Sequence, residues 1–114
     1  MKDGFIKVAA ASPMIKVADA SYNAGKVIEC MKKASDEGVK VLVFPELTLT
    51  GCSCYDLIGH SVILRGAEAA LERVIEASAG SDMLVIVGLP YAPRGGALYS
   101  VAAVITDGEL LGLV

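Results

Sequence analysis

Hydrophobic residues follow two different patterns that alternate along the chain. Nearly unbroken apolar runs at residues 5–11, 40–44 and 83–90 predict three strands, and the second of them is expected to be buried on both faces. Between these runs, apolar residues recur at the three- and four-residue spacing of an α-helix, over residues 19–37 and 61–78. Strand and helix therefore alternate over most of the chain.

Polar residues and glycines indicate where these elements begin and end. Asp19 or Ser21 suits the N-cap position of the first helix, and Gly38 follows its last turn. Two further strand-like runs surround Asp107 and Gly108, a dipeptide that tolerates the positive φ angles of a tight hairpin turn. The last part of the chain is therefore expected to be an antiparallel hairpin.

The predicted order of elements is strand, helix, strand, helix, strand, strand, strand. Strands connected through a helix are expected to be parallel, and strands connected by a tight turn antiparallel. No internal repeat, low-complexity segment or linker divides the sequence. These features predict a single α/β unit with a mixed sheet and helices on one face.

Composition excludes several classes of protein. The chain has 114 residues, 54% of them hydrophobic, and a mean hydropathy of +0.59, so intrinsic disorder is excluded. A net charge of -3 and a pI near 5.0 provide no basic surface for nucleic acid. No apolar run approaches the roughly 18 residues of a membrane span, and no signal-peptide pattern is present. A cytoplasmic protein without nucleic-acid or membrane partners is expected.

Cysteine and histidine content argues against a metal site. In the cytoplasm Cys30, Cys52 and Cys54 are expected to be free thiols. Cys52 and Cys54 are separated by one residue, whereas zinc and redox motifs use a two-residue spacer. With His60 as the only histidine, no set of metal ligands is predicted.

The ionisable residue that calls for an explanation is Glu46. It comes directly after the buried run 39–44 and Pro45, at the carboxyl end of a predicted strand. Open α/β sheets place their ligand sites there, and a partly desolvated carboxylate can act as a general base. A glutamate that terminates a strand or forms an ion pair is the structural alternative, and strand position alone does not decide between them.

Two other interpretations remain open on the residues alone. Cys52 or Cys54 could be a nucleophile activated by a neighbouring base, or a small thiol packed in a loop. His60, at the start of a predicted helix, suits a capping or surface role better than catalysis. The glycines of the chain form neither a phosphate-binding loop nor a dinucleotide-binding pattern, so no cofactor is predicted.

Four segments together resemble the nitrilase, or carbon–nitrogen hydrolase, superfamily. They are "FPELTLTG", "CYDL", "MLVIVGLP" and "LYSVAAVITDGELLGLV", and the resemblance extends in order from Phe5 to Val114. Within the superfamily, the pattern is most similar to the glutaminase domain of glutamine-dependent NAD+ synthetases. The runner-up is another carbon–nitrogen hydrolase, of the ω-amidase or β-ureidopropionase type, and a third possibility is a short non-catalytic assembly module.

The resemblance implies the N-terminal part of an α-β-β-α sandwich, with residues 1–114 as one portion of a single hydrolase domain. It also implies a Glu-Lys-Cys triad that hydrolyses the side-chain amide of glutamine. Glu46 matches the general base, and the lysine and the nucleophilic cysteine are expected beyond Val114. The chain alone is therefore expected to be inactive. Because a fragment that ends on "LLGLV" would leave an apolar strand edge and sheet face exposed, the chain is also expected to self-associate as a homo-oligomer.

The sequence departs from the family at two positions. Cys52 stands where a tyrosine commonly lines the substrate pocket, and Ser100 replaces a common asparagine. Cys52 is therefore the candidate substrate-binding residue. The resemblance implies no cofactor for this chain, because ATP and Mg²⁺ would belong to a synthetase domain that the sequence does not include.

Overall fold

The computed structural model describes residues 6–16, 19–50, 61–92 and 99–114 of the chain. Its elements follow the predicted order of strands and helices. They are β1 (Val8–Ala10), α1 (Ala20–Asp36), β2 (Val41–Val43), α2 (Ser61–Ala77), β3 (Leu84–Tyr91), β4 (Tyr99–Thr106) and β5 (Glu109–Leu113).

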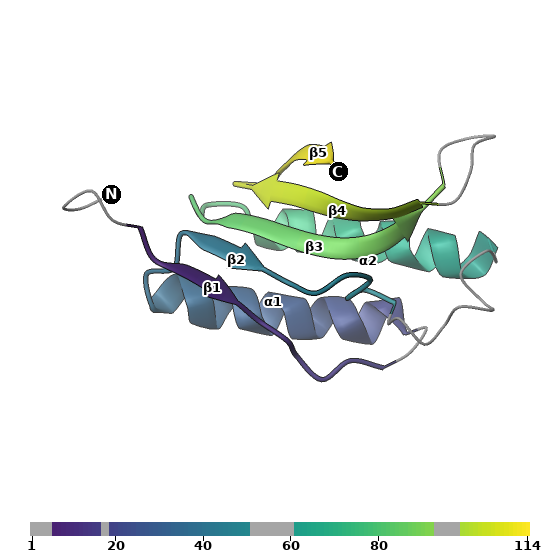
Figure 1. Ribbon diagram of the computed structural model, residues 1–114, viewed down its shortest axis with the longest axis horizontal. Coiled ribbons are helices and arrows are strands. Elements are labelled where there is room, and N and C mark those ends of the chain that lie inside the picture. Colours follow the sequence, from purple (N-terminus) through teal and green to yellow (C-terminus); the bar gives the residue numbers. More distant parts are fainter. Residues whose placement is uncertain (1–5, 17–18, 51–60, 93–98) are drawn as a thin grey trace.

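The strands form one mixed sheet, as the sequence predicts. They lie in the order β1-β2-β3-β4-β5, with β1, β2 and β3 parallel and β4 and β5 antiparallel to their neighbours. Both helices lie on the same face of this sheet, behind the strands in the view of Figure 1. The α/β class and the placement of the helices on one face are therefore confirmed.

Helix α1 begins and ends at polar signals that the sequence displays. The side chain of Asp19 accepts a hydrogen bond from the backbone N–H of Tyr22, 3.1 Å away, so Asp19 rather than Ser21 is the N-cap. Gly38 follows the C-cap with a φ of 80°, a conformation that costs glycine little. The buried positions of α1 recur at helical spacing: Ala20, Asn23, Ala24, Val27, Met31 and Ala34.

The hydrophobic core lies between the helices and one face of the sheet. Along β3 the side chains of Val85, Val87 and Leu89 point into this layer and are fully buried. Leu42 of β2 and Ile105 of β4 join them from the neighbouring strands. Alternate residues of each strand therefore belong to opposite faces of the sheet, as the pleat requires.

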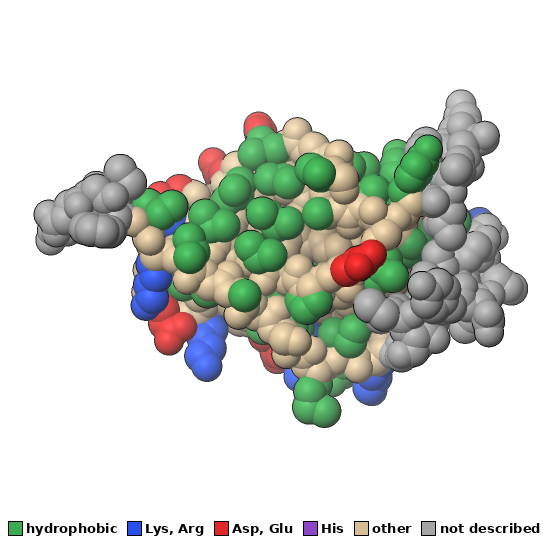
Figure 2. Space-filling view, viewed as in Figure 1, with side chains coloured by type: hydrophobic (Ala, Val, Ile, Leu, Met, Phe, Trp, Pro, Cys, Tyr) green, Lys and Arg blue, Asp and Glu red, His purple; other side chains and the backbone are tan. Residues whose placement is uncertain are grey.

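The opposite face of the sheet is apolar but carries no helix. Val43 of β2 is 39% exposed and Val8 of β1 is 62% exposed. The expectation that β2 is buried on both faces is therefore wrong, because only its helix-facing residue Leu42 is covered. In the space-filling view, hydrophobic side chains spread broadly over the strands on this side of the molecule (Figure 2).

The predicted hairpin turn is present between β4 and β5. Asp107 and Gly108 adopt φ angles of 45° and 76°, the combination that matches the twist of paired strands. The turn is also attached to the end of α2: Asp107 Oδ1 accepts a hydrogen bond from the N–H of Gly80 at 2.8 Å. In addition, the N–H of Gly108 donates to Ser78 Oγ at 2.8 Å. The hairpin is thus fixed against the helical layer.

Candidate active site

Glu46 lies two residues beyond Phe44, at the carboxyl end of β2. Since β2 runs parallel to β1 and β3, this end of the strand is the edge where open α/β sheets bind ligands. The Glu46 side chain is exposed, so the partial desolvation expected from the adjacent apolar strand is not found. The carboxylate is therefore accessible to a reacting group rather than enclosed by the strand.

Gly88 of β3 controls how closely the Glu46 segment approaches the sheet. A Cβ atom at this position would lie 2.5 Å from the backbone N of Leu47 and 2.8 Å from the carbonyl oxygen of Pro45. The carbonyl of Gly88 in turn accepts a hydrogen bond from the N–H of Leu49 at 3.1 Å. Only a residue without a side chain allows this contact between two stretches of backbone.

The segment after Glu46 is a tight turn with a strained residue. Leu47 has a φ of 54°, the left-handed region that L-residues with a Cβ rarely adopt. The N–H of Thr50 donates to the carbonyl of Leu47 at 3.1 Å, and the hydroxyl of Thr48 donates to the carbonyl of Pro45. Thr48, Leu49 and Thr50 are buried, so the residues after Glu46 are packed into the protein while Glu46 itself is exposed.

Asn23 attaches this turn to helix α1. Its side chain is fully buried, and its Nδ2 donates to the carbonyl of Leu49 at 2.9 Å. The same carboxamide donates to the carbonyl of Lys16 and accepts from the Lys16 N–H, both at 2.7 Å. One side chain therefore connects the segment before α1 with the segment after β2. The periodicity of α1 places Asn23 on its buried face, which is the signal that could have identified it.

The carboxylate of Glu46 also has a partner from a distant part of the chain. Ser100 Oγ donates a hydrogen bond to Glu46 Oε1 at 2.8 Å, across 54 residues of sequence. Ser100 lies at the start of β4, paired with Pro90 near the end of β3. The sequence marks Ser100 only as a departure from the family pattern, and its contact with Glu46 emerges only in three dimensions.

Three of the other candidate residues cannot be placed relative to Glu46, and a fourth, Cys30, lies on helix α1. Cys52, Cys54 and His60 fall outside the described residues, so the pocket-lining role predicted for Cys52 stays a prediction. Cys30 is partly buried on α1, packed against the core, and burial raises the pKa of its thiol. A buried, protonated thiol is a poor nucleophile, so Cys30 has the properties of a structural residue.

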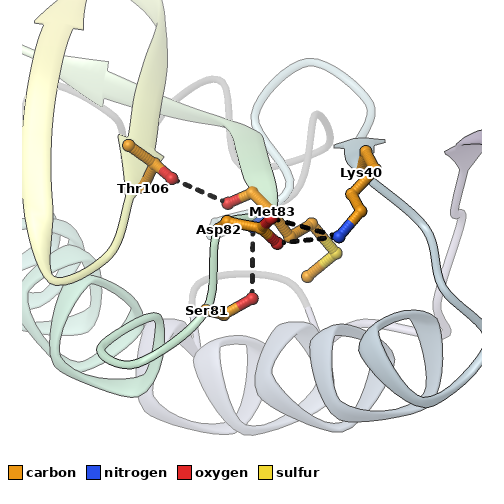
Figure 3. A network of polar contacts seen from close by, with 5 residues as sticks. All are labelled: Lys40, Ser81, Asp82, Met83 and Thr106. Carbon is orange, nitrogen blue, oxygen red and sulfur yellow. Dashed lines mark hydrogen bonds and ion pairs between the residues drawn. The ribbon is translucent and has the colours of Figure 1, made fainter. Parts of the chain in front are cut away.

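A second polar cluster lies at the opposite end of the parallel strands. Lys40 immediately precedes β2, and its ammonium group contacts the Asp82 carboxylate at 3.0 Å (Figure 3). The hydrogen bond from Lys40 lowers the pKa of Asp82. Nearby, a cavity of about 650 Å³ opens between the C-terminal half of α1 and the turn that follows α2, with Met31 and Met83 among its lining residues. Both features lie at the amino ends of the strands, away from Glu46.

The part of the chain that the structure describes contains no group of three His, Cys, Asp or Glu side chains that could hold a metal ion. Within the same residues, no helix combines the length and the apolar character needed to cross a bilayer. Among the described residues, the candidate site offers the exposed carboxylate of Glu46, a hydroxyl that donates to it and a tight turn.

Comparison with known proteins identifies the family of the chain. A model of the carbon–nitrogen hydrolase family matches residues 7–113 of the chain. The chain belongs to the carbon–nitrogen hydrolase family. Glutamine-dependent NAD+ synthetase of Mycobacterium leprae is 34% identical over 110 residues, which cover 96% of this chain. The enzyme of the same name from Mycobacterium tuberculosis is 35% identical over 111 residues, or 97% of this chain.

The chain spans only 16% of the length of these mycobacterial relatives, in their N-terminal portion. Among solved structures, a glutamine-dependent NAD+ synthetase from Cytophaga hutchinsonii superposes with a TM-score of 0.86 at 23% identity, covering 95% of this chain and 18% of its own. An amidase of the nitrilase superfamily from Nesterenkonia AN1 gives a TM-score of 0.75 at 17% identity, covering 96% and 42%. At these identities the two superpositions show the fold alone, the nitrilase-type arrangement that the sequence predicts.

Proposed function

We propose that this chain supplies the general base of a glutaminase site, with Glu46 as the base. The observation that carries the proposal is the placement of Glu46: an exposed carboxylate on a rigid turn at the carboxyl end of a parallel strand, in a chain 34% identical to a glutamine-dependent NAD+ synthetase. Such a turn fixes the backbone that carries the base before any substrate arrives, and general-base catalysis requires a base at a defined position.

In the proposed reaction, Glu46 accepts the proton of a cysteine thiol that lies beyond Val114 in the longer polypeptide. The thiolate attacks the side-chain amide carbon of glutamine and a C–S bond forms; Glu46 returns its proton to the amide nitrogen, the C–N bond breaks and ammonia leaves. Water then attacks the thioester carbon while Glu46 accepts its proton; the C–S bond breaks, glutamate is released, and the proton returns to the cysteine sulfur. A lysine, also beyond Val114, stabilises the developing oxyanion.

The ammonia would serve an ATP-dependent amidation of nicotinic acid adenine dinucleotide to NAD+. ATP and Mg²⁺ would then bind to a synthetase domain outside these residues, and glutamine would be the small-molecule substrate of the complete glutaminase domain. The names of the two mycobacterial relatives, which join glutamine to NAD+ synthesis, support this assignment. Residues 1–114 would form the first portion of that single glutaminase domain.

A chimera tests the role of Glu46. Residues 1–114 replace the matching segment of the Mycobacterium tuberculosis synthetase, and NAD+ formation is measured with glutamine and, separately, with ammonium chloride. We expect Glu46→Gln to lower the glutamine-supported rate by at least about a hundredfold, the usual effect of losing a general base. The ammonium-supported rate should persist, which shows that the chimera is folded.

The matched control is Glu68→Gln, which changes an exposed carboxylate on α2 by the same single atom. It should leave both rates unchanged. If Glu46→Gln retains the glutamine-supported rate, Glu46 is not the base and the proposal fails.

The isolated chain provides an independent test, because it lacks a nucleophile in the proposed scheme. Ammonia release from glutamine by residues 1–114 should equal that of the Glu46→Gln variant. The reading frame after codon 114 should continue with Pro-Lys, a strand-borne cysteine and, further on, a Ser-Gly-Gly pyrophosphate loop. A stop codon after Val114, with a defined and stable oligomer, would favour the assembly module instead.

A further inference from the structure

We propose that Ser100 is a positioning residue for Glu46: its hydroxyl holds the carboxylate in the orientation from which the base acts. The inference rests on the function proposed for Glu46 and adds a residue to that site. It starts from the hydrogen bond of 2.8 Å between Ser100 Oγ and Glu46 Oε1. Both side chains are exposed, so burial does not force them together.

The backbone around Glu46 is fixed, but the backbone alone does not orient a glutamate side chain. The contact of the turn with Gly88 and the hydrogen bond from Asn23 to Leu49 fix the main chain at 46–50. A glutamate side chain still has three rotatable bonds and many possible rotamers. The hydrogen bond from Ser100, on another element, restricts which of these rotamers the carboxylate adopts.

Ser100 is well placed to be this donor because of the sheet register. It pairs with Pro90 at the carboxyl end of β3, the strand that lies between β2 and β4. Two residues before Pro90, Gly88 has no side chain to separate the 45–47 backbone from β3. The hydroxyl of Ser100 on β4 therefore reaches across the end of β3 to the carboxylate of Glu46, which follows β2.

The consequence for the reaction is geometric. A general base must lie within hydrogen-bond distance of the proton that it accepts, and small displacements of such a group lower the rate strongly. The Ser100 hydroxyl donates its hydrogen bond to one carboxylate oxygen, Oε1, and so fixes the direction in which the carboxylate points. Loss of this donor should reduce turnover while substrate binding is maintained.

The direct test measures the Glu46 side chain in the 114-residue chain by NMR. Three-bond couplings about the Cα–Cβ and Cβ–Cγ bonds report its rotamer populations. We expect one dominant rotamer in the wild type and in Ser100→Thr, which keeps the hydroxyl. Ser100→Ala should instead show averaged couplings. Couplings that are equally ordered in Ser100→Ala would overturn the inference.

The control is Thr106→Val at the other end of the same strand. The hydroxyl of Thr106 donates to the carbonyl of Met83 at 3.1 Å, so this variant also removes one β4 hydroxyl bond. It should leave the Glu46 couplings unchanged. A general loosening of β4 would affect both variants, whereas a specific positioning role affects Ser100→Ala alone.

The functional arm uses the chimera with the mycobacterial synthetase. Ser100→Ala should lower the glutamine-supported kcat by about tenfold with KM little changed, and Ser100→Thr should restore it. An unchanged kcat in Ser100→Ala would overturn the positioning role even if Glu46 proves essential. If Glu46→Gln has no effect in the chimera, the proposed function fails, while the NMR couplings still show whether Ser100 orients the side chain.

Discussion

At the scale of single residues, the site depends on Gly88, which carries no functional group. Its carbonyl accepts the Leu49 N–H, and its missing Cβ allows the backbone of 45–47 to lie against β3. The atoms that would meet a side chain there are backbone atoms, which cannot rotate away as a flexible side chain would. The geometry of the turn is therefore sensitive to one methyl group.

Gly88→Ala should destabilise the chain by about 2–3 kcal/mol, because the added Cβ would lie 2.5 Å from the Leu47 nitrogen. Urea unfolding followed by circular dichroism measures the free energy. Gly25→Ala is the control: it lies within α1 with nothing within 4 Å of the added atom. That variant should gain about 0.5–1 kcal/mol. A Gly88→Ala chain as stable as the wild type would contradict the close contact.

The ion pair at the other end of the sheet gives a prediction about pH. Lys40 donates a hydrogen bond to Asp82 and lowers its pKa below the ordinary value of 3.8. A carboxyl whose pKa is lower in the folded state stabilises the fold above that ordinary value. This contribution is lost as the pH falls through the folded-state pKa.

The thermal midpoint of Asp82→Asn should therefore lie slightly below that of the wild type at pH 7, and the two should converge as the pH falls below the folded-state pKa of Asp82. The difference at pH 7 should be small, since both side chains are exposed. It should shrink further at about 1 M salt, where the screening length is about 3 Å. A difference that persists at low pH would show that the substitution acts in another way.

At the scale of elements, Asn23 connects helix α1 to the turn that carries Glu46. Its carboxamide satisfies three backbone groups, on Lys16 and Leu49, in a fully buried position. Removal of this side chain leaves those groups without partners, and each buried unsatisfied group is costly.

We expect Asn23→Ala to lower the free energy of unfolding by about 3 kcal/mol, as judged from the cost of unsatisfied buried groups. Ser35→Ala, at an exposed position of the same helix, should change it by less than about 0.5 kcal/mol. Chemical denaturation measures both variants. Equal effects of the two would mean that Asn23 contributes only helix propensity.

Most elements were predictable because their signals are local. Asp19 and Gly38 mark the ends of α1, and Asp107 with Gly108 forms the turn that such a dipeptide favours. The contacts that build the site are not local: Gly88, Asn23 and Ser100 act on a segment that is distant in sequence. The position of Glu46 at the carboxyl end of β2 was also predictable from the apolar run that precedes it, and its role as a base stays a prediction.

The run at residues 40–44 shows a different limit of sequence reasoning. Continuous apolar residues indicate that side chains favour removal from water, but they do not show which layer covers them. Leu42 is covered by the helices, whereas Val43 is 39% exposed on the other face of the sheet. The continuous apolar pattern therefore predicts more burial than the structure gives to this strand.

At the scale of the whole molecule, the sheet face that carries no helix forms an apolar surface. The helices cover one face of the five-stranded sheet, and hydrophobic side chains extend over the other (Figures 1 and 2). At one edge, β5 adds Leu110 and Leu111, which are 41% and 57% exposed. Contiguous exposed apolar surface and open strand edges both favour association with another chain.

We expect the 114-residue chain to self-associate through this uncovered sheet face at micromolar concentration. Val43→Lys places a charge at an exposed position of this face and should shift the chain toward the monomer, because a charge is costly to bury in an apolar contact. Sedimentation velocity at several concentrations measures the shift. Ala69→Lys, on the exposed side of α2, adds the same charge elsewhere and should not alter association.

A wild type that is monomeric at every concentration would show that the exposed valines of this sheet face are insufficient for assembly. A shift of equal size in both variants would mean that the added net charge, and not its position on the sheet face, reduces association.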